Sequence, residues 1–504
     1  MALHRLTGRN RRRGSGPAPG TAASGAAATA GGAFGWSLAN TLVSRLGTLV
    51  IGVILARVLG PEEFGTFAIA MVALMAVLSF NELGVSLAIV RWPGEPGKIF
   101  STVNTISVVG SVLFCAVAWL VAPAFTALMG DPQATLVVRL LILSVILNGV
   151  VAGPAALLQR VFREKERLFI DQANTWIGAG ISVILALLGF GAMALAIGRL
   201  AGSLVAMVLF LRASPLGYRL GWSRQYVAPL LRFGLPLAGA SIIVFATSYA
   251  DQLTTGATLG TTALGFYLLA YNLSSWPLSI VSQPLRRVAP AAFSAIQSAP
   301  KEQKRVILAL FTLVSCATAP AFGAIAGAAE PLIRMVYGSA WIPSAAVLSW
   351  LVVAAFSKVL CELAYDFIVV SGNTAVVLKL QGIGLLVSIP LMITGASVMG
   401  INGVAIAQVA VSFLVLLPMY LWFLRSRDIR LRDVLARIGL PFLAGVMVGG
   451  AAALLARFVA NPLLAVLGAA GISVAVIVVL VYLRRVDLAA IRTITRTETE
   501  METR

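Results

Sequence analysis

The sequence predicts an all-α integral membrane protein that crosses the bilayer about fourteen times. Of its 504 residues, 59% are hydrophobic and only 11% are charged, and the mean hydropathy is +0.94. Soluble domains contain roughly 45 to 50% apolar residues. Apolar runs of about 20 residues recur along the chain, and a backbone in hydrocarbon must satisfy its own hydrogen bonds, so these runs are expected to be helices.

Short hydrophilic connections separate the apolar runs. The predicted spans are 34–58, 66–90, 100–122, 135–156, 172–190, 191–211, 233–254, 262–285, 306–328, 341–368, 374–395, 400–424, 438–457 and 462–483. An even number of spans places both chain ends on one side of the membrane. The connections are too short for a nucleotide-binding domain, and the sequence has no Walker-type phosphate loop. ATP-driven pumping by this chain alone is therefore not expected.

The net charge of +19 indicates orientation in the membrane and not a nucleic acid partner. Most of the 38 Lys and Arg residues lie in the two tails and in every second connection. By the positive-inside rule these segments are cytoplasmic. Residues 1–33 are expected to be a disordered basic cytoplasmic tail, and 484–504 a cytoplasmic C-tail. A signal peptide is the alternative for the N-terminus, but 34–58 is longer than the usual apolar region of about 7 to 15 residues.

Metal, cofactor and His-dependent chemistry are not expected. Cys115, Cys316 and Cys361 all lie in apolar segments at spacings that suit neither a metal site nor a disulfide framework. The single histidine, His4, lies in the N-terminal tail. No catalytic residue, metal ligand or cofactor site is therefore assigned.

The chain matches itself when its two halves are aligned. A shift that places Gly60 on Gly260 also places Leu59 on Leu259, Gly65 on Gly265 and Ala70 on Ala270. A similar shift pairs Gly191, Ala196, Ile197, Ala201 and Ser203 with Gly400, Ala405, Ile406, Ala410 and Ser412. Duplication of a six-helix unit gives a parallel repeat, because six is even. The alternative is chance recurrence of the small residues that membrane helices favour.

This repeat divides the chain into an N-lobe of six spans at 34–211 and a C-lobe of six spans at 233–424. The last two spans, 438–483, are then an addition to the duplicated unit. The hairpin at 60–65, with the sequence GPEEFG, is expected to be structural, since Pro and Gly supply its turn geometry.

Charged residues inside the predicted spans are candidates for function. Each costs about 2.5 to 3.5 kcal/mol on insertion scales and must face protein or a water-filled cavity. Arg45 lies about eleven residues into its span, beside a polar stripe that contains Asn40 and Ser44. It is expected to line a cationic substrate cavity; the alternative is a structural ion pair with Glu82.

The second half carries a denser set of intramembrane charges. Lys358, Glu362 and Asp366 are spaced by four and share one helix face. They suit ion coupling or gating, or else a structural network. Asp251 has the same two interpretations, since it lies late in its span and is either functional or a solvated cap.

A short basic amphipathic stretch follows the fourth predicted span. It contains Arg160, Arg163, Lys165 and Arg167 beside Val161, Phe162, Leu168 and Phe169. Arg160, Arg163 and Arg167 are candidates for contact with phosphate headgroups at the cytoplasmic surface. The alternative is a plain topology signal.

Several motifs resemble the polysaccharide flippases of the multidrug/oligosaccharidyl-lipid/polysaccharide superfamily, the Wzx-like group. They are ARVLGPEEFG at 56–65, Gly84, AIVR at 88–91, LQR at 158–160, Asp251 with LG at 259–260, LGFY at 264–267, and 332–338. The likeness covers roughly residues 34–424.

The resemblance implies a monomeric, two-lobed flippase of the bacterial cytoplasmic membrane that moves polyprenyl-diphosphate-linked oligosaccharide to the outer leaflet by alternating access. It implies a cationic cavity, which Arg45, Arg199, Lys358 and Lys379 fit by type and placement. Membrane lipids, and a polysaccharide polymerase with its export machinery, are the further partners implied. The alternatives are a cation-coupled exporter of small molecules, which would favour carboxylates and aromatics in the cavity, and a membrane glycosyltransferase, which the short outer connections disfavour.

Overall fold

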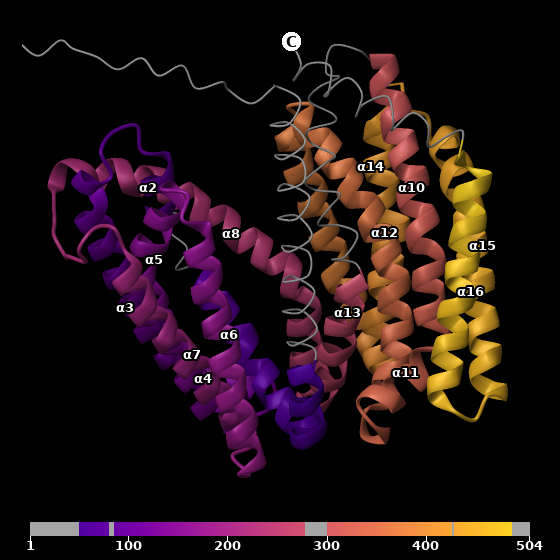
Figure 1. The fold of residues 1–504 in the computed structure, drawn as a ribbon, viewed down its shortest axis with the longest axis horizontal. Helices are drawn as coiled ribbons and strands as arrows, with labels where there is room; N and C mark the ends of the chain where they lie inside the picture. Colours follow the sequence, from indigo (N-terminus) through magenta and orange to yellow (C-terminus); the bar gives the residue numbers. More distant parts are fainter. Residues whose placement is uncertain (1–49, 80–84, 278–299, 426–427, 486–504) are drawn as a thin grey trace, which may run out of the picture. The chain divides into compact units, whose positions relative to one another are not determined.

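The computed structural model describes residues 50–79, 85–277, 300–425 and 428–485 (Figure 1). The chain divides into two units, Met1–Gly52 and Val53–Arg504. Only the helical residues 50–52 of the first unit are described, so Arg45, Asn40 and Ser44 lie outside the described residues. Glu82 lies outside them as well. All other described residues belong to the second unit.

The described residues form helices and no β-strand. The first helix is Val50–Ser79. It is followed by α2 (Val85–Arg91), α3 (Gly97–Leu128), η1 (Pro132–Ala134), α4 (Thr135–Ile142), α5 (Ser144–Arg160), α6 (Glu164–Leu187), α7 (Ala192–Ala213) and α8 (Arg224–Leu259). After the helical residues 261–277 come α10 (Pro300–Gly327), α11 (Ala329–Val336), η2 (Ser339–Trp341), α12 (Ser344–Val370), α13 (Thr374–Ala410), η3 (Val411–Leu416), α14 (Leu417–Leu424), α15 (Leu431–Phe458) and α16 (Pro462–Leu483).

The predicted fold class is confirmed. Within the described residues, 11 helices are long and apolar enough to cross a membrane. Val376–Leu424 covers two predicted spans that meet at Gly400, and Val50–Ser79 covers parts of two predicted spans on either side of Gly60. Both glycines have a positive φ. The helical residues 261–277 belong to a further predicted span. Each of the fourteen predicted spans thus includes helical residues in the described part of the chain.

Several helices begin earlier than the predicted spans, and α6 and α8 show the largest differences. α6 starts at Glu164, where 172 was predicted, and α8 starts at Arg224, where 233 was predicted. In both cases the basic connection itself is helical, so the helix continues beyond the apolar run. Hydropathy marks the apolar part of a helix and not its ends.

Backbone conformation supports the internal repeat. Gly191 and Gly400, which the sequence alignment pairs, adopt nearly the same rare conformation, φ 55° with ψ −140° and φ 59° with ψ −140°. Gly60 and Gly260 also share a positive φ, 73° and 80°. A positive φ is strained for residues with a Cβ, which explains why glycine occupies these turns.

A third pair of turns extends the repeat beyond the sequence matches. Gly130 and Gly338 both have positive φ, 78° and 96°. η1 follows the first of these turns and η2 follows the second. We call the end of the bundle that carries Gly60, Gly130, Gly191, Gly260 and Gly338 the glycine-turn end. It is the end that the positive-inside rule predicts to face outward.

The hairpins that carry Gly60 and Gly260 pack against each other. A Cβ added at Gly65 would lie well under 3.0 Å from the carbonyl oxygen of Thr261, and one added at Gly265 would meet that of Pro61. The sequence shift pairs Pro61 with Thr261, so the contact is reciprocal. Such reciprocity is what an approximate two-fold relation between the two halves produces.

Trp341 joins both hairpins at the glycine-turn end. Its Nε1 donates to the carbonyl oxygen of Ala56 at 3.1 Å. Its ring meets Phe64 and Phe266 edge-on, with ring centroids 5.5 Å and 5.9 Å apart. Arg57 adds a second link, because its guanidinium donates to the carbonyl oxygens of Met335 and Val336 at the end of α11. This position suits a cation, because the helix dipole places a partial negative charge at the C-terminus of α11.

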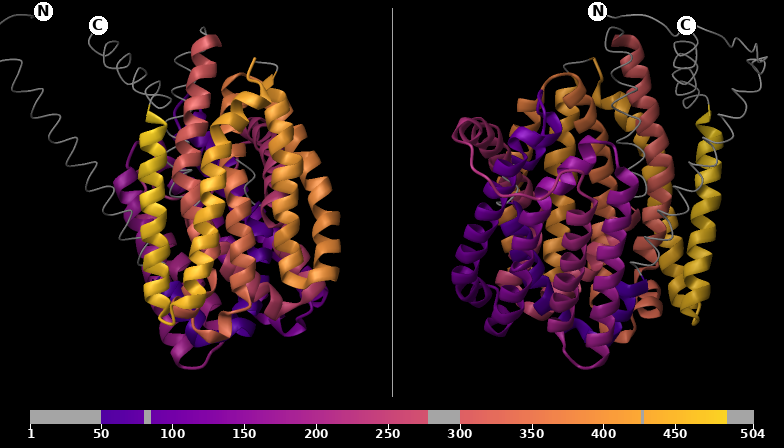
Figure 2. Two further views of the ribbon diagram at one scale, coloured as in Figure 1. Left: turned by 90° about the vertical axis from the view of Figure 1, so that its right-hand side faces the viewer. Right: turned by 60° about the vertical axis from the view of Figure 1, so that its left-hand side comes forward.

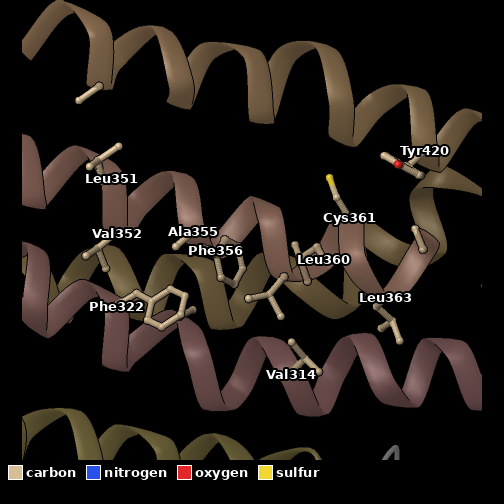
Figure 3. Close-up of a cluster of buried hydrophobic side chains, with 14 of the residues drawn as sticks. Val314, Phe322, Leu351, Val352, Ala355, Phe356, Leu360, Cys361, Leu363 and Tyr420 are labelled. Carbon is tan, nitrogen blue, oxygen red and sulfur yellow. The ribbon is translucent and has the colours of Figure 1, made fainter. Parts of the chain in front are cut away.

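Each half has its own buried core. Ile69, Leu74 and Leu141 are among the buried residues of the first core, and Phe311 and Phe367 are among those of the second. Figure 3 shows part of the second core, where Phe322 and Val314 of α10 face Val352, Phe356 and Leu360 of α12. Because lipid is itself apolar, close packing and not burial from water holds these helices together.

The last two helices attach to α10 through glycines. α15 and α16 run beside α10 (Figures 1 and 2). Gly323 and Gly327 of α10 lie against Gly445 and Gly449 of α15 so closely that a Cβ at any of the first three would overlap the facing backbone. Two GxxxG segments in direct contact are a recurrent way to bring membrane helices together. The sequence analysis did not identify this pair.

Leucine at Gly445 is therefore expected to loosen α15 from α10. Overpacking of a tight contact costs about 1 to 3 kcal/mol, and main-chain atoms cannot rotate away. The thermal midpoint of the purified protein in detergent measures the effect. Gly450→Leu is the matched control, because Gly450 lies on the same helix with nothing within 4 Å. Equal midpoints for the two variants would show that this contact does not hold α15.

Candidate functional site

A polar cavity lies within the second half of the chain. Its volume is about 560 Å³. It is lined by residues of α8, the helix 261–277, α12, α13, η3 and α14. The lining is rich in hydroxyl and amide groups, supplied by Thr247, Ser248, Ser274, Ser275, Gln381, Ser388, Gln408 and Ser412, and in tyrosines, Tyr271, Tyr365 and Tyr420.

Asp251 of α8 is fixed at one wall of this cavity. Its side chain is buried, with 2% of its surface exposed. The carboxylate accepts hydrogen bonds from Tyr267 Oη at 2.9 Å, Gln408 Nε2 at 3.0 Å and the backbone N–H of Gln252 at 2.8 Å. The three donors lie on three different helices, so Asp251 links these helices. Because the side chain is buried and fully engaged, the interpretation of this residue as a solvated cap is wrong.

Lys358 and Glu362 of α12 line the same cavity. Lys358 is attracted electrostatically by both Asp251 and Glu362. One cation and two carboxylates thus share a cavity in the apolar part of the protein. Opposite charges compensate one another there only in part, since the cluster keeps a formal charge of about −1.

The first half provides an internal comparison for these charges. By the shift that places Gly191 on Gly400, Lys358 and Glu362 correspond to Gly149 and Gly153 of α5. Both glycines are in tight contact with α3, at Ser111 and Asn104. The equivalent helix therefore packs through small residues without charges. The fold does not require Lys358 and Glu362, which favours a functional role for them.

The structure separates the other predicted site residues. Arg199 of α7 lies within electrostatic range of Tyr249 on α8, the helix that carries Asp251. Asp366 is buried on α12 but does not line the cavity. Lys379 of α13 is exposed and lies outside the cavity as well.

Sequence reasoning missed the partners of Asp251 and the tyrosines. Tyr267 falls in the LGFY segment, and Gln408 falls inside the segment that matches the first half. Neither residue was predicted to belong to the site. Cys361 and Tyr420, which Figure 3 shows at the edge of the core, also line the cavity. Uncharged polar residues give little signal in a hydropathy profile, since many such residues face helix partners.

The basic residues after α5 make internal contacts. Arg160 donates to the carbonyl oxygens of Ile89, Trp92 and Gly94 and so closes the C-terminus of α2. Arg163 pairs with Glu166, and Arg167 approaches Glu164 with 3.9 Å between nitrogen and oxygen. Arg160 therefore has a structural role, and headgroup contact by Arg163 and Arg167 stays a prediction.

A duplicated bundle of membrane-spanning helices with a charged polar cavity defines a multi-pass membrane protein of the transporter type. Comparison with known proteins agrees with this class. Residues 54–346 match the family described as polysaccharide biosynthesis protein. The chain belongs to this family, and its likeness to the Wzx-like flippases of the multidrug/oligosaccharidyl-lipid/polysaccharide superfamily is confirmed.

Curated relatives include two polysaccharide proteins. The succinoglycan biosynthesis transport protein ExoT of Rhizobium meliloti is 26% identical over 61% of this chain, and the match spans 62% of its own length. The lipopolysaccharide biosynthesis protein WzxC of Escherichia coli is 23% identical over 75% of this chain and 77% of its own length.

Solved structures share the fold. The lipid II flippase MurJ in an inward closed conformation aligns with a TM-score of 0.73 at 13% identity, over 88% of this chain and 98% of MurJ. An inward-facing multidrug resistance MATE transporter aligns with a TM-score of 0.60 at 15% identity, over 76% of this chain and 94% of the transporter.

Proposed function

We propose that this protein is a flippase that moves polyprenyl-diphosphate-linked oligosaccharide from the cytoplasmic to the outer leaflet of the bacterial cytoplasmic membrane. The polar cavity is the observation that carries the proposal. A sugar-diphosphate cannot cross hydrocarbon unaided, because its hydroxyls and charges would lose their water. A cavity lined by hydroxyls, amides and tyrosines replaces that water, while the lipid tail stays in the bilayer.

Lys358 is proposed to bind the diphosphate part of the substrate, although the described charges of the cavity sum to about −1 and the cationic cavity that the resemblance implies is not seen among the described residues. Lys358 lines the cavity, and Arg199 approaches the helix that forms one wall. Arg45, Asn40 and Ser44 are proposed to extend this surface; the alternative for Arg45 is a structural ion pair with Glu82. Glu82, Asp251, Glu362 and Asp366 are proposed for ion coupling or gating, since ionisable residues inside the membrane mark ion pathways and proton relays.

Alternating access is the proposed mechanism. The N-lobe at 34–211 and the C-lobe at 233–424 would rock against each other, with the spans at 438–483 outside the moving pair. Both termini are proposed to lie in the cytoplasm. Binding and gating need no covalent intermediate, so the proposal contains no catalytic residue. A monomer is proposed, working beside a polysaccharide polymerase and its export machinery.

Deletion of the gene tests the proposal directly. Lipid-linked oligosaccharide is expected to remain in the cytoplasmic leaflet, and surface or secreted polysaccharide is expected to fall to background. Leaflet distribution is measured by the accessibility of the glycan to an impermeant periodate or lectin probe in spheroplasts and inverted vesicles. An unchanged distribution would remove the flippase proposal.

A second candidate function rests on the two cavity carboxylates. Asp251 and Glu362, together with three tyrosines, also suit an organic cation. A cation-coupled exporter of small molecules is therefore the alternative. Efflux of an organic cation dye from cells with and without the gene separates the two candidates. Dye efflux that depends on the gene, with unchanged polysaccharide, would favour the exporter.

A further inference from the structure

A groove lies between the N-terminal end of α6 and the C-terminal end of α7. Its volume is about 420 Å³. It is lined by Lys165, Glu166, Phe169 and Ile170 of α6 and by Leu209, Arg212 and Ala213 of α7. Lys165 and Phe169 are spaced by four, and Leu209 and Arg212 by three, so each helix presents one basic and one apolar side chain to the groove.

The charges of this groove are not balanced by protein. Among the described residues, neither Lys165 nor Arg212 makes an ion pair or a side-chain hydrogen bond. Glu166, the one carboxylate in the lining, is held by Arg163, whose Nη1 also donates to the carbonyl oxygen of Ala213. The neighbouring pairs are thus closed, and two cations are left facing one groove.

The apolar wall of the groove is open as well. Phe169 has 68% of its surface exposed, and Leu209 lines the opposite side. An inorganic anion would satisfy Lys165 and Arg212 but would leave Phe169 uncovered. A ligand with an anionic head and an apolar tail covers both parts.

We propose that this groove binds an anionic phospholipid, with its phosphate between Lys165 and Arg212 and an acyl chain along Phe169 and Leu209. Arg160, Arg163 and Arg167, the candidates that the sequence offered for headgroup contact, each approach other protein groups, whereas Lys165 and Arg212 have no such partner among the described residues. The site is independent of the transported substrate. It fixes the ends of α6 and α7 to one leaflet, whatever the cavity carries.

Lipid retention on the purified full-length protein tests the site. Native mass spectrometry in a mild detergent compares phosphatidylglycerol with phosphatidylcholine of the same acyl chains. The wild type is expected to retain the anionic lipid at least about tenfold better. Lys165→Gln with Arg212→Gln is expected to remove the preference. Arg219→Gln with Arg224→Gln is the control, since it removes two charges from the adjacent connection without touching the groove.

Two further measurements keep the result clear. The thermal midpoint of the groove variant must match that of the control variant, which shows that lipid loss is not unfolding. Phe169→Gln is expected to weaken phosphatidylglycerol retention while both cations remain. Equal retention by the wild type and the groove variant would overturn the proposal. Displacement of the lipid by millimolar inorganic phosphate would also overturn it, because the site would then recognise phosphate alone.

Discussion

The Lys358→Met variant is expected to lose at least about nine-tenths of transport, which corresponds to about 1.4 kcal/mol or more in the transport barrier. Methionine keeps an unbranched side chain of similar length and removes only the charge. Asp251 and Glu362 then share the cavity without their cation. The cavity becomes more negative, which disfavours a diphosphate and raises the cost of keeping both carboxylates ionised. Export of lipid-linked oligosaccharide, normalised to inserted protein, measures the effect.

Lys379→Met is the matched control for this variant. It makes the same chemical change in an exposed residue outside the cavity, so export is expected to stay normal. A loss of export in both variants would mean that net charge and not the cavity is responsible.

The role of Lys358 is separated from a purely structural one by a second substitution. Removing one member of a buried ion pair can cost about 3 to 5 kcal/mol, so Lys358→Met alone could reduce the amount of folded protein. Adding Asp251→Asn removes one unbalanced carboxylate and keeps an acceptor for Tyr267. Recovery of folded protein without export would support a role in substrate binding. Recovery of export would mean that Lys358 serves only as the counter-ion of Asp251 and does not bind the substrate.

Much of the fold could be predicted because membrane insertion depends on local sequence. Apolar length and alternating positive charge place the spans, and glycine marks the turns, since Gly60, Gly191, Gly260 and Gly400 need positive φ. The pairing of α10 with α15 could not be predicted in the same way. It joins spans far apart in the sequence through Gly323 and Gly445, and small residues of this kind occur in many spans.

The candidate site could be predicted residue by residue but not as a set. Asp251, Lys358 and Glu362 stand out as charges in apolar runs, yet their meeting depends on how α8 and α12 both pack against α13. Lys379 shows the limit of this reasoning. The cavity face of α13 carries Gln381, Leu385 and Ser388, and a residue two positions before Gln381 is turned away by roughly 200°.

Alanine at Gly65 or Gly265 is expected to destabilise the contact between the two halves at the glycine-turn end. A Cβ at either position would overlap a carbonyl oxygen of the opposite hairpin, and both oxygens belong to the main chain. The hairpins must then separate, at a cost of about 1 to 3 kcal/mol for one substitution. Gly382→Ala is the control, because this helical glycine has nothing within 4 Å. There alanine is expected to be neutral or stabilising by roughly 0.5 to 1 kcal/mol.

The double variant distinguishes one shared contact from two separate ones. If Pro61 and Thr261 form a single reciprocal interface, the separation forced by Gly65→Ala also makes room at Gly265. The combined loss in thermal stability is then smaller than the sum of the two single losses, as expected for residues in direct contact. Additive losses would mean that each glycine fits its own neighbour independently. In that case the matching backbone turns would still be evidence for duplication of the chain. The contact between the two halves would then consist of two independent contacts and not of one symmetric interface.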